Sequence, residues 1–269
     1  MNISIIIPTK NEQQNLPRLL LSIRNAQTPP EEIIIIDNRS TDGTVRVAKD
    51  VWGQRKSNPP LRIITKGRER SQQRNAGAQR ARGTHLLFLD ADMEILPSLP
   101  AKLLSNARKG ATAVVIKERA VGHDFWGKAI ALERNCYTGK SLLEAPRFIE
   151  AKTFKKLGGY DPSLIAGEDW DLSERLNNHG VQIIRTHAYL IHHETSGFLP
   201  NLRRKWYYTQ HIRRYAHKHP NLFVQQASPI PRLRIFWDAR NKLMKYPAHT
   251  LAFLILKTII YIRFRLTRQ

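Results

Sequence analysis

The sequence contains a single cysteine, Cys136, among its 269 residues. An intramolecular disulfide is therefore excluded, and we expect the protein in a reducing compartment. The first residues form a short strand-like run and lack the basic region, apolar core and cleavage site of a secretory leader. We therefore expect no signal peptide. No internal repeat or low-complexity segment is present either.

Acidic residues are scarce, and this shortage is concentrated near the C-terminus. The chain has 44 Lys and Arg against 22 Asp and Glu, a net charge of +22. Residues 201–269 hold 15 Lys and Arg against Asp238 alone, or +14, which leaves +8 for the first 200 residues. A region this basic predicts an anionic partner or a solvated surface. Nucleic acid and anionic lipid are the candidates, and the absence of a recognised nucleic-acid motif favours lipid.

Short apolar runs alternate with segments of helical periodicity over the first 200 residues. This alternation predicts an α/β fold with a mostly parallel, wound sheet and flanking helices. We expect strands at 3–7, 33–36, 61–64, 85–90, 113–116, 181–184 and 189–193, and helices from 16, 41, 71, 97 and 168 onwards. A short segment at 147–150 should lead into a further helix.

Two carboxylates end the fourth predicted strand, which reads Leu-Leu-Phe-Leu-Asp-Ala-Asp from Leu86 to Asp92. Open α/β sheets bind ligands at the carboxyl ends of their strands. Mg²⁺ is usually held there by one or two carboxylates together with phosphate oxygens. Asp90 and Asp92 therefore predict a divalent-cation site, although turn formation and helix capping would use the same residues.

Glycine is absent from the segment that follows the first predicted strand, Pro8 to Glu12. A dinucleotide-binding dehydrogenase carries G-x-G-x-x-G at this position. The sequence therefore argues against a dehydrogenase. It favours a site that recognises a nucleotide with side chains and binds the phosphates of that nucleotide through a metal ion.

Five segments together resemble glycosyltransferase family 2, whose members have the GT-A nucleotide-sugar fold. They are 5–12, 37–44, 74–77, 88–92 and 167–172, and the resemblance covers roughly residues 1–195. It implies a catalytic domain at 1–198, with a nucleotide-sugar half at about 1–95 and an acceptor half at about 96–198. The basic, aromatic region at 199–269 matches no family motif, and we expect it to be helical.

The same resemblance implies a set of donor-binding and metal-binding residues. Asp92, together with Asp90 and either His192 or His193, is implied to bind Mg²⁺ or Mn²⁺. Alternation along a strand lets only one of those two histidines face the site. Asn75 and Gly77 suit helix–strand packing as readily as ligand contact. The residues implied to bind the nucleoside-diphosphate sugar are Pro8, Thr9, Glu12, Asp37, Ser40, Arg74 and Asp90.

The resemblance also implies a general base at the start of the helix near residue 168. Inverting transfer needs a carboxylate that deprotonates the acceptor hydroxyl as it attacks the anomeric carbon. Asp169 is the expected base, with Glu168 or Asp171 as the fallback, and Trp170 as a residue that could stack on a sugar. Favourable interaction with the helix dipole is the alternative role for all three acids.

The basic C-terminal region interleaves aromatic residues with arginine and lysine, as in Arg203 to Tyr208. Its apolar run, 251–262, is interrupted by Lys257 and is shorter than the ~20 residues that span a bilayer. We expect a helix in the headgroup region of an anionic membrane. Packing of these aromatics on the catalytic domain is the alternative.

The sequence therefore predicts an inverting, metal-dependent glycosyltransferase that modifies a hydroxyl of a glycan or lipid-linked acceptor at the cytoplasmic face of a membrane. A polyprenyl-phosphate glycosyltransferase is the first alternative. A sugar-1-phosphate nucleotidyltransferase fits less well, because Lys10-Asn11-Glu12 is a poor match to its glycine-rich loop. The non-enzyme alternative is an inactive module that binds membrane or, less readily, nucleic acid.

Overall fold

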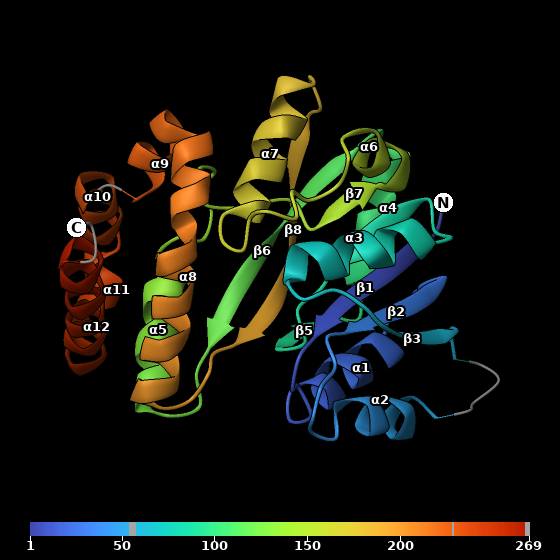
Figure 1. Ribbon diagram of the computed structural model, residues 1–269, viewed down its shortest axis with the longest axis horizontal. Coiled ribbons are helices and arrows are strands. Elements are labelled where there is room, and N and C mark those ends of the chain that lie inside the picture. The colour runs from blue at the N-terminus through green and yellow to red at the C-terminus, as the bar shows by residue number, and fades with distance from the viewer. Residues whose placement is uncertain (54–57, 228, 267–269) are drawn as a thin grey trace. The chain divides into compact units, whose positions relative to one another are not determined.

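The computed structural model describes residues 1–53, 58–227 and 229–266 (Figure 1). The last three residues of the predicted basic region lie outside this range. The strands are β1 (Ile3–Thr9), β2 (Glu32–Asp37), β3 (Leu61–Thr65), β4 (His85–Phe88), β5 (Met93–Ile95), β6 (Ala113–Val121), β7 (Phe148–Glu150) and β8 (Ile183–His193). The helices are α1 (Leu16–Arg24), α2 (Thr44–Trp52), α3 (Arg70–Arg80), α4 (Leu99–Arg108), α5 (Phe125–Arg134), α6 (Ala151–Lys156), α7 (Glu168–Asn178), α8 (Phe198–Lys218), α9 (Pro220–Ala227), α10 (Pro229–Asp238), α11 (Arg240–Met244) and α12 (Pro247–Leu266).

The chain divides into two compact units. Unit 1 comprises Met1–Lys117, Ala145–Pro162 and Asp169–Ile191, and unit 2 comprises Glu118–Glu144, Ser163–Glu168 and His192–Gln269. These units differ from the predicted division at residue 198, because segments from the middle of the chain group with the C-terminal helices. The functional division into a catalytic domain and a tail stays a prediction.

The strands form one eight-stranded sheet in the order β3-β2-β1-β4-β7-β6-β8-β5. Strands β3, β2, β1 and β4 are parallel, so their carboxyl ends lie at one edge. The pairing of Thr9 with Asp37 is the last step of the β1–β2 register. Strand β7 is antiparallel to both β4 and β6, so the sheet is mixed, with its parallel part confined to the first four strands.

Three strand predictions need correction at their boundaries. Strand β4 ends at Phe88, two residues before the predicted end, and the short β5 was not predicted. The two strands expected at 181–184 and 189–193 are a single strand, β8. Its central residues, including Arg185 and His187, are polar and suggested a break. Exposed and buried side chains nevertheless alternate there, as one continuous strand requires.

Alternate side chains of β1 enter two separate apolar clusters in unit 1. Ile3, Ile5 and Ile7 pack with helices α1, α2 and α4, whereas Ile6 packs on the other face. That second face is covered by α3, α6 and α7. Burial on both faces explains why the parallel strands are apolar throughout.

Glycine allows the close approach of α3 to the sheet. A Cβ at Gly77 would lie 2.5 Å from Cγ2 of Ile6, a distance that real Cβ contacts do not show. Asn75 on the same helix donates to the carbonyl of Tyr160 at 2.7 Å and accepts from its N–H at 2.9 Å. In this structure Asn75 and Gly77 therefore serve packing, one of the two roles expected for them.

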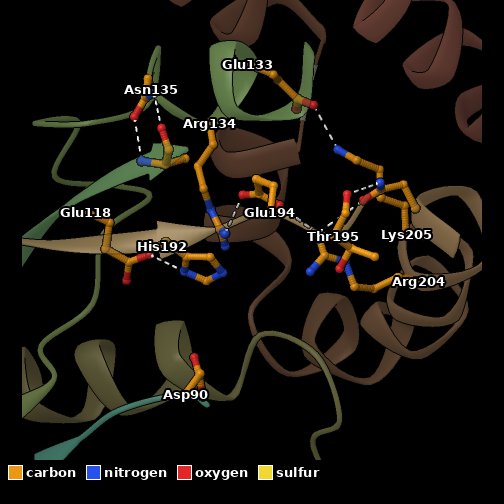
Figure 2. A network of polar contacts seen from close by, with 12 residues as sticks. Asp90, Glu118, Glu133, Arg134, Asn135, His192, Glu194, Thr195, Arg204 and Lys205 are labelled. Carbon is orange, nitrogen blue, oxygen red and sulfur yellow. Dashed lines mark hydrogen bonds and ion pairs between the residues drawn. The ribbon is translucent and has the colours of Figure 1, made fainter. Parts of the chain in front are cut away.

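Unit 2 is built around α5 and the C-terminal helices, and α5, α11 and α12 contribute to its apolar cluster. The buried side chains are Ala129, Leu132, Cys136, Leu243, Ala252 and Phe253. Two buried carboxylates are shared by pairs of cations in the same unit, and Figure 2 shows Glu194 with Arg134 and Arg204, and Glu133 with Lys205. Glu133 contacts Lys205 and Lys257 at 2.8 Å each, and Glu194 contacts Arg134 and Arg204 at 2.8 and 2.7 Å.

Helix α12 is longer than the apolar run that predicted it. By length and composition alone, Pro247–Phe264 is a candidate membrane span, in contrast to the expectation that the run is too short. Only 17% of this segment is buried. A single helix of this kind is weak support for a membrane span, so the orientation of α12 has to be argued from its contacts.

Candidate functional site

The carboxyl ends of β1 and β2 bring three predicted donor-binding residues together. The buried carboxylate of Asp37 accepts hydrogen bonds from Thr9 Oγ1 at 3.0 Å and from the backbone N–H of Ser40 at 2.8 Å. Ser40 Oγ also donates to Asp37, at 2.6 Å. Pro8 lies buried in β1 immediately before Thr9. Asp37 thus organises its own loop, and its predicted contact with a nucleotide base stays a prediction.

Side chains join the loops after β1 and β2 directly. The Asn11 N–H donates to Ser40 Oγ at 2.8 Å, and the Thr41 N–H donates to Asn11 Oδ1 at 2.9 Å. Asn11 and Arg39 have φ values of 55° and 47°, in the left-handed region that favours glycine. Asp42 instead accepts from the Thr44 N–H at 2.9 Å, just before α2 begins. The crowded loops leave each backbone little freedom.

Arg74 is the centre of the candidate site. Its side chain is 1% exposed, and its guanidinium contacts Asp90 at 2.7 Å and Asp169 at 3.1 Å. The arginine lies on α3, Asp90 follows β4, and Asp169 is on α7. A buried, shared arginine differs from the solvated helix charge that is usual for this residue type. It brings the predicted metal ligand and the predicted base together, while its contact with donor phosphates stays a prediction.

Arg147 is a site residue that the sequence did not reveal. Its Nη2 lies 3.2 Å from the second carboxylate oxygen of Asp90. The residue immediately precedes β7, and its carbonyl accepts from the Phe88 N–H. Only the antiparallel pairing of β7 with β4 places it there. Apolar patterns do not encode strand direction, so no sequence signal could have identified this contact.

Glu12, Asp90 and Asp92 concentrate negative charge within unit 1. Burial, together with the neighbouring Asp92, Asp90 and Asp42, raises the pKa of Glu12 to about 7 against the lowering effect of a hydrogen bond from Asn15. Carboxylates that repel one another in this way suit a hard divalent cation. Such a cation prefers oxygen ligands, and its charge would relieve the repulsion between the carboxylates. Asp90 and Asp92 lie in the turn between β4 and β5.

The described ranges contain no ready-made cluster of three or more His, Cys, Asp or Glu side chains that could hold a metal ion. His192 is buried, and its Nδ1 lies 3.2 Å from Glu118, as Figure 2 shows. His193 is half-buried and stacks on His123, with ring nitrogens 3.1 Å apart. The two histidines therefore have different partners, and the assignment of either as a ligand stays a prediction.

The acids at the start of α7 have different environments. Asp171 is fully buried and pairs with Arg175 at 2.9 Å, which in turn donates to the carbonyls of Leu157 and Gly159. Glu168 is also buried, whereas the Asp169 side chain is 33% exposed. Trp170 is half-buried. Asp169 is thus the acid of the three that combines solvent access with a contact to the Arg74 cluster.

The residue before these acids is held by the C-terminal helices. Gly167 has a φ of +79°, and a Cβ there would lie 2.6 Å from Cγ of Tyr215 on α8. The Tyr215 hydroxyl donates to Gln226 of α9 at 2.9 Å, and Arg214 donates to the Ser163 carbonyl at 3.1 Å. Within unit 2, therefore, the basic helices contact the segment that leads into α7.

A mixed sheet with flanking helices, and with carboxylates at the carboxyl ends of its parallel strands, is the architecture of GT-A glycosyltransferases. Two solved structures share this fold. Mannosyltransferase PcManGT from Pyrobaculum calidifontis, in complex with GDP-Man and Mn²⁺, has a TM-score of 0.58, 18% identity, and covers 98% of this chain and 82% of its own. S. aureus TarS 1–349 in complex with UDP-GlcNAc has a TM-score of 0.57 and 18% identity, covering 79% and 66%.

The sequence matches the family described as Glycosyl transferase family 2 over residues 4–159. The chain belongs to this family, as its motifs predicted.

Curated relatives carry glycan-related names. The chain is 28% identical over 234 residues to O-antigen biosynthesis protein RfbC of Myxococcus xanthus, covering 72% of this chain and 17% of RfbC. It is 31% identical over 118 residues to dolichol-phosphate mannosyltransferase of Pyrococcus furiosus, covering 43% and 32%. It is 27% identical over 201 residues to succinoglycan biosynthesis protein ExoA of Rhizobium meliloti, covering 68% and 60%. The chain therefore spans less than two thirds of each of these relatives.

Proposed function

We propose that this chain is an inverting, metal-dependent glycosyltransferase that moves a sugar from a nucleoside diphosphate to a hydroxyl acceptor. The observation that carries the proposal is the double contact of Arg74, which lies 2.7 Å from Asp90 and 3.1 Å from Asp169. A buried cation of this kind fixes the distance between a donor-side carboxylate and an acceptor-side carboxylate. Inverting transfer requires both at one reacting centre.

The reaction assigns a separate task to each carboxylate. Asp169 takes the proton from the acceptor hydroxyl, whose oxygen bonds to the anomeric carbon as the bond to the nucleoside diphosphate breaks. Asp92 and Asp90 would hold a divalent cation, with His192 or His193 as a further ligand. When bound, this cation supplies Lewis-acid stabilisation of the departing diphosphate. Arg74 and Arg147 orient Asp90 from two sides.

The donor loops have the polar groups for nucleotide recognition. Thr9, Asp37 and Ser40 form one hydrogen-bonded cluster at the ends of two parallel strands. Donor binding by this cluster is supported by the nucleotide sugars in the complexes of the fold neighbours, UDP-GlcNAc and GDP-Man. The nucleoside diphosphate, rather than the sugar alone, is the group that this site would recognise.

A glycan or lipid-linked acceptor at the cytoplasmic face of a membrane completes the proposal. Relatives named for undecaprenol-linked and dolichol-phosphate substrates support this class of acceptor. The basic, aromatic region at 199–269 supports peripheral association with anionic lipid. Nucleic acid is not required by any part of the proposal.

The direct test is a panel of nucleotide sugars, with nucleoside diphosphate release measured in Mg²⁺, in Mn²⁺ and in EDTA. We expect metal-dependent release from one donor and loss of that release in Asp92→Ala. Asp50→Ala is the matched control, because Asp50 is an exposed carboxylate on α2. Turnover that is unchanged by EDTA and by Asp92→Ala would contradict metal dependence.

A polyprenyl-phosphate glycosyltransferase is the second candidate, favoured by the relatives named for dolichol phosphate and undecaprenyl phosphate. A phosphate acceptor is already ionised and needs no base. Asp169→Asn should therefore lower kcat by about 10² to 10⁴ with a hydroxyl acceptor and leave most activity with a phosphate acceptor. An inactive membrane-binding module would release no nucleoside diphosphate from any donor, with either acceptor present.

A further inference from the structure

We propose that the exposed apolar face of helix α12 docks flat on an anionic bilayer and that the helix does not cross the bilayer. This inference identifies the membrane-contacting surface of the proposed enzyme and rests on that proposal only for its biological setting. Physical evidence for the surface comes from the exposure of apolar side chains, from a buried ion pair and from the charges nearby.

Apolar side chains form a stripe along one face of α12. Leu251, Ile255 and Ile262 are 60, 46 and 52% exposed. Leu254, Ile259 and Tyr261 are also exposed, and the spacing of three or four residues places most of this set along one side of the helix. The opposite side is different, because Ala252, Phe253 and Leu256 are buried. We call the exposed set the outer face of α12.

Lys257 fixes the orientation of the helix within unit 2. The residue lies in the middle of α12, on the side away from the outer face, and its Nζ is 2.8 Å from Glu133 of α5. Burial and the ion pairs with Lys205 and Lys257 together set the pKa of Glu133: burial would raise it, but the two lysines hold it well below its ordinary value. Glu133 is therefore a charged anchor for α12.

A membrane-spanning orientation conflicts with these contacts. If α12 crossed a bilayer, Lys257 would lie near its centre together with Glu133 and Lys205, or the ion pairs would have to break. Either result is expensive, because charged groups at the bilayer centre are strongly disfavoured. The packing of Phe253 in the cluster with Ala129 and Leu132 would also be lost. Docking in the plane of the membrane keeps every one of these contacts.

The charges beside the outer face select anionic lipid as the occupant. Exposed cations in the described part of α10 to α12 are Arg234, Arg240, Lys242, Lys245 and Arg263. The acid in this stretch, Asp238, is 3.0 Å from Lys140. Arg240 stacks on exposed Trp237, and Arg263 stacks on Trp206 at 4.0 Å, pairing cations with interfacial aromatics. Apolar insertion flanked by such cations is typical of helices that lie at an anionic interface.

Depth measurements on the full chain distinguish docking from spanning. Cys136, the single native cysteine, is replaced by Ala, and an environment-sensitive fluorophore is attached to Leu251→Cys, Ile255→Cys or Ile262→Cys. With phosphatidylglycerol-containing vesicles, all three probes should shift to the blue and report the same shallow depth. A spanning helix would instead separate positions 251 and 262 by about 16 Å in depth, at 1.5 Å per residue, and would overturn the proposal.

A charge substitution tests the outer face independently. Leu254→Glu should weaken vesicle binding at least about tenfold, because a leucine that would insert into the bilayer is replaced by an anion near anionic headgroups. Leu21→Glu on α1 is the matched control, since both leucines are 39% exposed. Equal vesicle binding of the two variants would overturn the proposal. A doubled molecular mass and shielded probes in the absence of lipid would also overturn it, because they would show that the outer face pairs with a second copy of the protein.

The outcomes for docking and for catalysis can be separated. Donor turnover without vesicles should be the same in Leu254→Glu and in the unmodified protein, because Leu254 is an exposed residue that is not among the candidate site residues. Vesicle binding without any donor turnover would reject only the proposed function. Donor turnover without vesicle binding, including in phosphatidylglycerol, would reject only the docking surface.

Discussion

The two units use buried charge in opposite ways. In unit 1 a buried cation, Arg74, is shared by two carboxylates, Asp90 and Asp169. In unit 2 each of two buried carboxylates, Glu133 and Glu194, is shared by two cations. Unit 1 therefore surrounds a buried cation with acids, as the proposed metal and base sites would require, whereas unit 2 surrounds buried acids with cations, in keeping with its proposed anionic partner.

The surfaces of the two units also differ, because unit 2 exposes more large hydrophobic side chains than unit 1. Among the described residues, the large hydrophobic side chains that are exposed in unit 1 are Met1 and Leu21, whereas twelve lie between Val224 and Ile262 of unit 2. An α/β layer with helices on both faces can bury its apolar residues by itself. The C-terminal helices leave apolar side chains exposed, which is the property that the proposed membrane-docking surface requires.

The largest effect on this comparison is expected from removing the shared cation of unit 1. Arg74→Met should lower the free energy of unfolding by about 4 kcal/mol, because it removes the buried cation that Asp169 and Asp90 share and leaves Asp90 with Arg147 alone. Arg74→Lys should recover only part of this loss, since a single ammonium replaces the two-pronged guanidinium. Chemical denaturation measures both. Equal stability of the Met variant and the unmodified protein would contradict the assigned role.

The converse change in unit 2 removes a shared acid. Glu133→Gln should lower the free energy of unfolding by about 3 kcal/mol, because it leaves Lys205 and Lys257, which are 24 and 26% exposed, without their shared carboxylate. Vesicle binding should weaken in parallel if α12 loses its anchor. Glu144→Gln, a change to an acid on the same unit outside the Glu133 ion-pair cluster, is the control in both assays.

Glu12 gives unit 1 a pH dependence that can be measured without substrate. Its folded-state pKa of about 7 lies above the ordinary 4.5, so between these values the folded protein holds a proton that the unfolded chain has lost. Stability should therefore decrease by up to about 3 kcal/mol as the pH rises from 4.5 through 7. Glu12→Gln should remove this contribution, which thermal denaturation at a series of pH values would show. A divalent cation bound nearby should lower the Glu12 pKa and flatten the profile.

A smaller effect tests how the segment before α7 is held. Gly167→Ala and Gly139→Ala both place a side chain at positive φ, +79° and +84°, at a cost of about 1 kcal/mol. Only the first change also meets an obstacle, the Tyr215 ring, whereas nothing lies within 4 Å of Gly139. Gly167→Ala should therefore lower the melting temperature more and also reduce kcat. Similar melting temperatures for the two variants would show that Tyr215 can move aside without cost.

The strand ends of unit 1 could be predicted from sequence because local patterns carry the information. Apolar runs that stop at Asp37 and Asp90 identify both the strand and its carboxyl end. The contacts among distant side chains could not be predicted in the same way. Arg74 was expected in the donor site through the family resemblance alone, since nothing in its sequence neighbours indicates the two acids that contact it, Asp90 after β4 and Asp169 on α7.

The charged core of unit 2 was missed for a related reason. A glutamate in a helix is usually solvated, and only the apolar run from Ala129 to Leu132 hinted that Glu133 faces inward. Its lysine partners are 72 and 124 residues away along the chain, at Lys205 and Lys257. Periodicity describes which side of a helix is apolar, but it does not indicate which helix supplies the compensating charge.

Strand β3 has a consequence for association between copies of the protein. It is one edge of the sheet, it follows Pro59 and Pro60, and its Arg62 is held by Glu32 at 3.0 Å and by the Arg80 carbonyl. Prolines and a charge on an edge strand oppose the addition of a further strand from another molecule. We therefore expect this edge of the sheet to resist edge-to-edge aggregation between copies of the protein.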